Sequence, residues 1–279
     1  MVLADTSYGG GSLIRALAAM PCFTPVPNGS EPTFNPIHAT DLGAVVDAAL
    51  HTPPPTNPIE VGGPETITLR DMLTHYRTWL GLLKTWVVTL PTALMQTISW
   101  LGDLCKMGPI SRTSLKQINA GVLADTTAMR TEIGTTPRGF STFANSHPVG
   151  TSDLWHVRLY FAKPATRLCL AVLWLASGIL GLLLPTEQFL SLLNTPIPDT
   201  ILVAFARAGG IIDLLIAAAL IRDWRHRQVT QLQFAMILGY TVVFTILNPA
   251  LWLLPLGGLL KNTPILMLLI FHAILQKER

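Results

Sequence analysis

Four apolar segments in the second half of the chain restrict its fold more than any other feature. They run over residues 166–184, 201–221, 232–247 and 264–275. The first two approach the ~20 apolar residues that a helix needs to cross the hydrocarbon core of a bilayer. The third and fourth are shorter, and the fourth crosses only if the stretch from about residue 254 contributes or the bilayer thins locally. We therefore predict that residues 151–279 form an all-α bundle of four transmembrane helices in contact with the lipid bilayer.

Basic residues flank these segments in a pattern that predicts their orientation. Three groups carry the pattern: Arg158, Lys163 and Arg167 before the first segment, Arg222, Arg225 and Arg227 after the second, and Lys277 and Arg279 after the fourth. The loop between the first and second segments has no lysine or arginine, and only Lys261 breaks the alternation. Because basic residues mark the cytoplasmic side of a membrane protein, we expect both termini and residues 1–150 to be cytoplasmic.

Asp213 lies near the middle of the second segment. An ionisable group at this depth costs at least about 2.5 kcal/mol and normally faces a partner or a cavity. Arg207 lies six residues earlier, about 240° away around the helix, so the two do not pair and Arg207 extends toward the outer interface. We expect a polar site that also includes Lys261, Asn262 and His272. Asp213 has two open roles there: a structural hydrogen bond between helices, or a proton-carrying or ligand-binding role.

Residues 1–150 alternate short apolar stretches with helical patterns. We expect strands at 2–4, near 38, at 59–61 and at 86–89, with helices beginning near residues 13, 40, 68 and 91. This alternation is typical of an α/β domain. No basic stripe with interleaved aromatic residues occurs, so nucleic acid is a poor candidate partner. The three cysteines, at 22, 105 and 169, lack the spacing of a zinc site, and we expect no metal.

The stretch TSYGGGSLI, residues 6–14, has three glycines between an apolar run and a helical pattern. A dinucleotide-binding loop reads G-x-G-x-x-G, with an acidic residue about 20 positions later. Gly9 and Gly11 fit the first two glycines, but Ile14 occupies the third position. We therefore expect a tight turn after a strand, with Ser12 capping a helix over 13–20.

The helical pattern after Pro91 gathers apolar residues on one side: Leu94, Ile98, Leu101 and Leu104. A side of this kind either packs into the core of the domain or rests on a membrane surface. Of these two arrangements we favour the core.

Longer stretches resemble two known families. SYGGGS, PIHATDLGAVVDAAL and EVGGPETITLRDML resemble the carboxy-terminal half of an atypical short-chain dehydrogenase/reductase of the NAD-dependent epimerase/dehydratase type. WHVRLYFAKPATRL and WLLPLGGLLKNTPIL resemble a DoxX-like membrane domain. This order matches a known bacterial fusion, which implies the bacterial inner membrane. The resemblance implies a partial Rossmann-like α/β domain over 1–150, lacking its amino-terminal half, and a DoxX-like four-helix domain over 151–279.

The resemblance also implies where a cofactor lies. In an intact relative, the stretch with Tyr8, Gly9, Gly10 and Gly11 lies near the nicotinamide end of NAD(P). The family's nucleotide loop and its Tyr-x-x-x-Lys pair would precede Met1, and no Y-x-x-x-K occurs here. We therefore name no catalytic residue and expect that this chain alone does not bind NAD(P). DoxX-like domains are associated with quinone-linked oxidation, so a quinone is a second candidate cofactor.

Two functions remain open at this point. The first is a membrane-anchored, amino-terminally truncated NAD(P)-dependent oxidoreductase, inactive without a separately encoded Rossmann half or a redox partner. The second is a non-enzymatic DoxX-like membrane subunit of a quinone-linked redox system.

Overall fold

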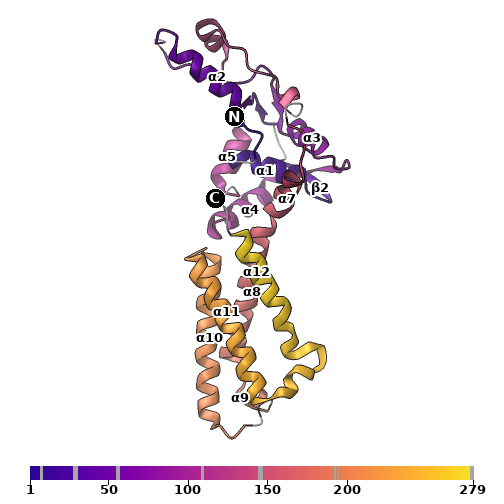
Figure 1. Ribbon diagram of the computed structural model, residues 1–279, viewed down its shortest axis with the longest axis vertical. Helices are drawn as coiled ribbons and strands as arrows, with labels where there is room; N and C mark the ends of the chain where they lie inside the picture. Colours follow the sequence, from indigo (N-terminus) through magenta and orange to yellow (C-terminus); the bar gives the residue numbers. More distant parts are fainter. Residues whose placement is uncertain are drawn as a thin grey trace. The chain divides into compact units, whose positions relative to one another are not determined.

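The computed structural model describes residues 1–6, 9–27, 31–54, 57–107, 110–143, 147–191, 193 and 195–276, except the side chains of residues 189 and 255–257. The chain divides into two compact units (Figure 1). The first contains Met1–Asp103 and Met107–Phe161, and the second contains Leu104–Lys106 and Ala162–Arg279.

The first unit combines short strands with helices. Its strands are β1 (Val2–Leu3), β2 (Phe23–Pro27), β3 (Thr33–Phe34), β4 (Ile37–His38), β5 (Ile67–Thr68) and β6 (Trp86–Leu90). Its α-helices are α1 (Gly9–Ala18), α2 (Ala39–Leu50), α3 (Leu69–Trp79), α4 (Thr92–Leu104), α5 (Arg112–Ala120) and α7 (Thr151–Tyr160). A π-helical turn, η1 (Met129–Ile133), and a 3-10 turn, η2 (Phe140–Thr142), complete it.

The strands pair only in twos within the described residues. β1 pairs with β4 and β2 with β6 in parallel, and β3 pairs with β5 antiparallel. The prediction of a partial Rossmann-like domain is therefore wrong, because that fold needs an extended parallel sheet. Prolines explain part of the difference. Pro25 and Pro27 of β2 are two residues apart, so both nitrogens face the same edge, and neither can donate a hydrogen bond to a further strand there.

The glycine stretch is also different from the prediction. Gly9, Gly10 and Gly11 form the first turn of α1, where Gly9 has the left-handed φ of 50°. Ser12 therefore lies inside the helix, and the predicted tight turn with a cap at Ser12 is wrong. Tyr8 lies outside the described residues.

Several local predictions for the first unit are confirmed. β1, β4 and β6 lie where strands were expected, and α2, α3 and α4 follow their predicted starts. Thr68 caps α3, because its hydroxyl accepts a hydrogen bond from the amide of Asp71 at 3.1 Å. The strand expected at 59–61 is absent from this described stretch.

The core of the first unit lies mainly between α1 and α3. Ile14 and Ala18 of α1 pack in one cluster with Met72 and Leu73 of α3, all of them buried. The aromatic rings of Tyr76, Phe140 and Phe143 extend this cluster. The core thus depends largely on helix packing, and Leu3 of β1, Val26 of β2 and Phe34 of β3 add buried side chains to it.

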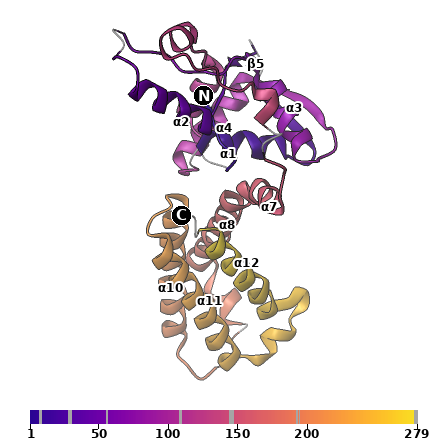
Figure 2. The same cartoon turned by 45° about the horizontal axis from the view of Figure 1, so that its top comes forward.

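The second unit is a helical bundle. Its helices are α8 (Ala162–Leu183), α9 (Thr186–Leu190), α10 (Asp199–Ile221), α11 (His226–Leu247) and α12 (Asn262–Leu275), with 3-10 turns η3 (Pro249–Leu253) and η4 (Pro255–Lys261) before α12. α8 contacts α10, α10 contacts α11, α11 contacts α12, and α12 contacts α8, so four helices close a ring (Figure 2).

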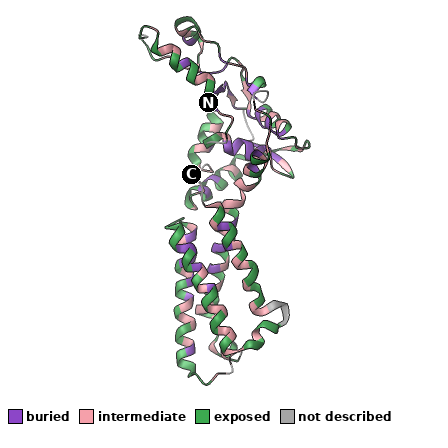
Figure 3. Cartoon of the chain, in the orientation of Figure 1, coloured by how far each residue is buried: buried purple, intermediate pink, exposed green. Residues whose placement is uncertain are grey.

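Four stretches of the described chain are long and apolar enough to cross a membrane. They are Thr151–Leu183, Asp199–Ile221, His226–Leu247 and Gly258–Leu275. Exposed residues cover much of α10 and α11 (Figure 3), and many are large and apolar, including Phe205, Leu215 and Ile246. This surface suits lipid rather than water, and the prediction of four helices able to span a membrane is confirmed. The fourth span does include part of the stretch before Pro264.

Candidate functional site

Asp213 lies near the middle of α10, and only 3% of its surface is exposed. Ser177 Oγ, on α8, donates a hydrogen bond to Asp213 Oδ2 at 2.6 Å. The Tyr240 hydroxyl, on α11, donates to Asp213 Oδ1 at 3.2 Å. Three helices therefore meet at one carboxyl group. The expectation that Asp213 needs a partner from another helix is confirmed by these two contacts.

Glycines bring the three helices close enough for these contacts. A Cβ atom on Gly178 of α8 would lie 2.9 Å from the carbonyl oxygen of Gly210 on α10. A Cβ atom on Gly209 would lie 2.8 Å from the Tyr240 hydroxyl. Small residues allow close approach of membrane helices. The glycines therefore shape the space in which Ser177 and Tyr240 reach Asp213.

The arrangement can hold Asp213 in either protonation state. A hydroxyl group both donates and accepts hydrogen bonds. Ser177 and Tyr240 can donate to the carboxylate, and either can accept from the protonated acid. No ion pair to Asp213 occurs among the described residues. The carboxyl group can therefore gain or lose a proton while its oxygens keep hydrogen-bond partners.

Arg207 has a different role from Asp213. Its guanidinium donates to the carbonyl oxygens of Gly181 at 2.9 Å and Leu184 at 3.0 Å, where α8 ends. The last carbonyl groups of a helix lack partners within it, and Pro185 has no N–H to offer Gly181. Arg207 thus caps α8, and the prediction that it does not pair with Asp213 is confirmed.

The structure does not bring the other predicted polar residues to Asp213. Asn262 Nδ2 donates to Thr241 Oγ1 at 2.7 Å. His272 is fully buried, and its Nε2 lies 3.0 Å from Gln276 Nε2. Lys261 is exposed. Within the described part of the chain, no hydrogen bond or ion pair joins these three residues directly to Asp213.

Sequence reasoning missed the actual partners of Asp213. Serine and tyrosine are common in membrane helices and carry no charge, so nothing local distinguishes Ser177 and Tyr240. It also missed a buried contact between Trp174 Nε1, which donates, and Gln233 Oε1 at 2.9 Å. A polar amide inside an apolar span is the sequence feature that could have pointed to Gln233.

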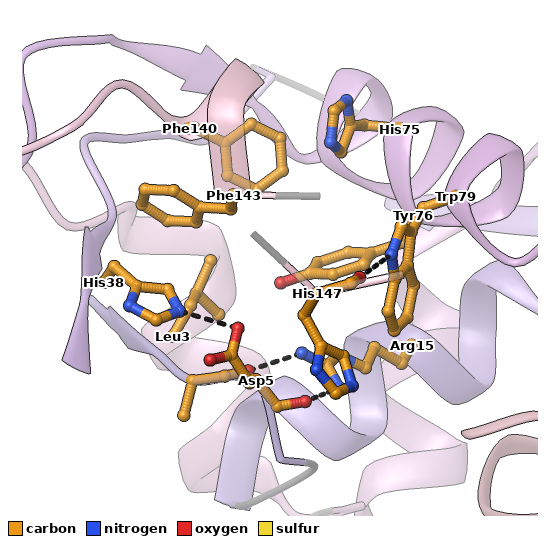
Figure 4. A pocket seen from close by; sticks show the side chains of 11 residues that line it. Leu3, Asp5, Arg15, His38, His75, Tyr76, Trp79, Phe140, Phe143 and His147 are labelled. Carbon is orange, nitrogen blue, oxygen red and sulfur yellow. Dashed lines mark hydrogen bonds and ion pairs between the residues drawn. The ribbon is translucent and has the colours of Figure 1, made fainter. Parts of the chain in front are cut away.

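The first unit contains a pocket lined by residues of β1, α1, α3 and η2 (Figure 4). It has about 330 Å³ of empty space, a volume that includes space open to solvent. Asp5 lies between His38 and Arg15 in it, with its Oδ1 3.1 Å from His38 Nε2. Four aromatic side chains line the pocket: Tyr76, Trp79, Phe140 and Phe143.

His38 belongs to a row of four polar side chains that contact one another in turn: Asp5, His38, Arg138 and Asp41. Arg138 Nη2 donates to His38 Nδ1 at 2.9 Å, and Arg138 Nε lies 3.0 Å from both oxygens of Asp41. Because Arg138 can only donate, His38 Nδ1 accepts and Nε2–H points to Asp5. Both ring nitrogens of His38 therefore have hydrogen-bond partners.

Burial shifts two pKa values at this pocket. It raises the pKa of Tyr76, and the positive charge of Arg15 opposes this shift. It lowers the pKa of His75, and the negative charge of Glu65 opposes that shift. Burial disfavours the charged form in each case, so both side chains are neutral at pH 7. The described residues contain no group of three or more His, Cys, Asp or Glu side chains that could hold a metal.

Comparison with known families finds one membrane family in the second unit. Residues 171–270 match the model of the DoxX-like family. The match begins within α8 and ends within α12, and it includes Ser177, Asp213 and Tyr240. No curated protein sequence matches the chain. The resemblance to a DoxX-like membrane domain is therefore confirmed for these residues, whereas the sheets of the first unit contradict the dehydrogenase fold.

Proposed function

We propose that the DoxX-like domain at residues 171–270 is a membrane subunit of a quinone-linked redox system, and that Asp213 takes up and releases a proton within it. The observation that carries the proposal is a buried carboxyl group between two hydroxyl groups from neighbouring helices. An ionisable group inside a membrane span is costly and commonly marks a proton or ligand pathway.

The proposal assigns a role to each of the three side chains. Reduction of a quinone to a quinol takes up protons together with electrons, so a quinone site inside a bilayer needs a proton-carrying group. Asp213 is that group. The Tyr240 hydroxyl keeps its own proton: it donates to the carboxylate and accepts from the protonated acid, and Ser177 fixes the second oxygen. A separate redox partner supplies the electrons.

The cellular location forms part of the same proposal. We place the spans in a bacterial inner membrane. The basic residues that precede the first span, separate the second and third, and follow the fourth favour a cytoplasmic location of both chain ends. In this orientation, the first unit faces the cytoplasm.

A structural role for Asp213 is the second candidate function, because both of its oxygens already have partners on other helices. In this case the carboxyl group holds α8, α10 and α11 together and binds no ligand. Interhelical hydrogen bonds in membranes contribute about 0.6 kcal/mol on average and at most about 1.7 kcal/mol. The proton-carrying role and the structural role predict different effects of replacing the carboxyl group at position 213 with an amide.

The experiment uses the full chain in lipid nanodiscs. Binding of a menaquinone or ubiquinone analogue is measured by titration, and protonation of the carboxyl group is followed by infrared difference spectroscopy. Asp213→Asn keeps a hydrogen-bonding group of the same size but cannot ionise. Asp199→Asn, at the exposed start of α10, is the matched control.

We expect Asp213→Asn to assemble normally, to lose the carboxyl infrared signal and to weaken quinone binding at least tenfold, a loss of about 1.4 kcal/mol. The Asp199 control should retain both. If Asp213→Asn binds the quinone analogue like the parent, the proposal is wrong. If Asp213→Leu alone loosens the bundle and no variant changes quinone binding, the structural role stands in its place.

A further inference from the structure

α4 turns its apolar side away from the first unit. The residues that seat it against the unit are small: Ser99 is 5% exposed, and Gly102 is buried. A Cβ atom on Gly102 would collide with the carbonyl oxygen of Ile110, so no larger residue fits there. The large apolar side chains are 40–55% exposed: Leu94, Ile98, Trp100, Leu101 and Leu104. The expectation that these leucines pack into the core is therefore wrong.

The exposed apolar residues share one side of the helix. At 100° per residue, Leu101 lies roughly 160° from Ser99, and the arc from Trp100 to Ile98 is roughly 160° wide. A helix on the surface of a soluble domain normally turns such an arc toward the core. A contiguous apolar surface left outside marks a site of contact with a partner or a membrane.

The chain itself indicates that the partner is the lipid bilayer. Leu104, the last residue of α4, belongs with Cys105 and Lys106 to the second unit. Arg167, in the first membrane-spanning helix, donates to the carbonyl oxygen of Cys105. The last residue of α4 and the two residues after it therefore belong to the membrane unit, and the chain that leaves α4 is held at the basic end of a membrane span.

We propose that α4 lies in the interfacial plane of the bilayer that holds the four spans. Leu94, Ile98, Leu101 and Leu104 enter the boundary between head groups and acyl chains, to a depth of about 5–10 Å. Trp100, at the edge of the arc, lies at the level of the head groups, where tryptophan is enriched. This inference does not depend on the proposed role of Asp213.

The test compares two positions on α4 in the full chain, reconstituted in phosphatidylcholine–phosphatidylglycerol nanodiscs. A nitroxide is attached to Leu101→Cys, on the apolar arc, or to Gln96→Cys, which is also exposed but lies about 140° away around the helix. Both variants carry serine at positions 22, 105 and 169. Collisions of the nitroxide with oxygen, which enters lipid, are compared with collisions with a water-soluble nickel complex.

We expect the label at 101 to collide several times more often with oxygen than with the nickel complex, and the label at 96 to show the reverse. Equal exposure of both labels to the nickel complex would place α4 in water and overturn the proposal. Protection of the label at 101 from both reagents would mean that protein covers the arc, and this result also overturns it. Spin–spin broadening between labelled chains would identify a second copy as the cover.

A second measurement avoids replacing the native cysteines. Brominated lipids quench tryptophan fluorescence on contact, so the parent chain is compared with Trp100→Phe in nanodiscs made from them. We expect the quenched component of the spectrum to decrease in Trp100→Phe. If quenching is unchanged by this substitution, Trp100 does not contact lipid and the proposed position of α4 is wrong.

Discussion

The contact between α8 and α10 predicts how the bundle responds to one added methyl group. Gly178→Ala places a Cβ atom 2.7 Å from Leu214 Cγ and 2.9 Å from the carbonyl oxygen of Gly210. The leucine can rotate, but the carbonyl oxygen belongs to the backbone of α10, so the helices must separate. Overpacking of this kind costs about 1–3 kcal/mol, equivalent to roughly a 5- to 140-fold change in the unfolding equilibrium constant.

Gly239 provides a matched control on α11. No atom lies within 4 Å of a Cβ placed on it, so Gly239→Ala meets open space. Replacing glycine by alanine inside a helix contributes about 0.8–1.0 kcal/mol through helix propensity alone. The same chemical change should therefore destabilise the bundle at 178 and be neutral or stabilising at 239.

The assay is reversible unfolding of the full chain in mixed micelles, followed by circular dichroism as the fraction of denaturing detergent increases. The midpoint should fall for Gly178→Ala and should stay or rise for Gly239→Ala. If the two variants unfold at the same midpoint, close approach at Gly178 does not stabilise the bundle, and the account of α8 and α10 given above is incorrect.

Three further predictions concern other parts of the chain. Arg138→Lys should destabilise the first unit by about 1 kcal/mol in urea unfolding, because one ammonium group cannot replace the fork that contacts both Asp41 and His38; an unchanged midpoint would count against that network. The pKa of His75 is lowered from 6.5 by burial, so the unfolded state binds the proton more readily and stability should fall as the pH drops from about 6.5 through the folded-state pKa. His75→Gln should flatten this dependence, and an equally steep curve in the variant would refute it. A topology reporter after residue 279 should be cytoplasmic and one near residue 194 external, and the opposite result at either place would overturn the orientation.

The membrane half was readable from the sequence because its signal is long and local. Runs of apolar residues set the four spans, and the cost of a buried carboxyl group singled out Asp213 before any partner was known. The partners could not be predicted in the same way. Ser177 and Tyr240 become special only when α8 and α11 are rotated and packed against α10, and that packing depends on glycines spread over two helices.

The first half shows where local patterns stop being informative. Strand, turn and helix signals placed β1, β4, β6 and α3 correctly, yet the sheet they suggested does not form. Pairing between distant strands is not encoded in a local pattern, and the prolines of β2 close one of its edges. For α4 the pattern revealed an apolar side but not what covers it, since protein and lipid favour the same residues.

The contact between Ser177 and Asp213 has a consequence for biosynthesis. α8 and α10 are consecutive spans, so they can enter the membrane as a hairpin before the ribosome has made α11. At that moment Tyr240 does not yet exist, and a lone carboxyl group would face lipid. Ser177 is already present in the same hairpin and can donate to it at once. The order of synthesis thus gives the acidic residue a partner at every stage of assembly.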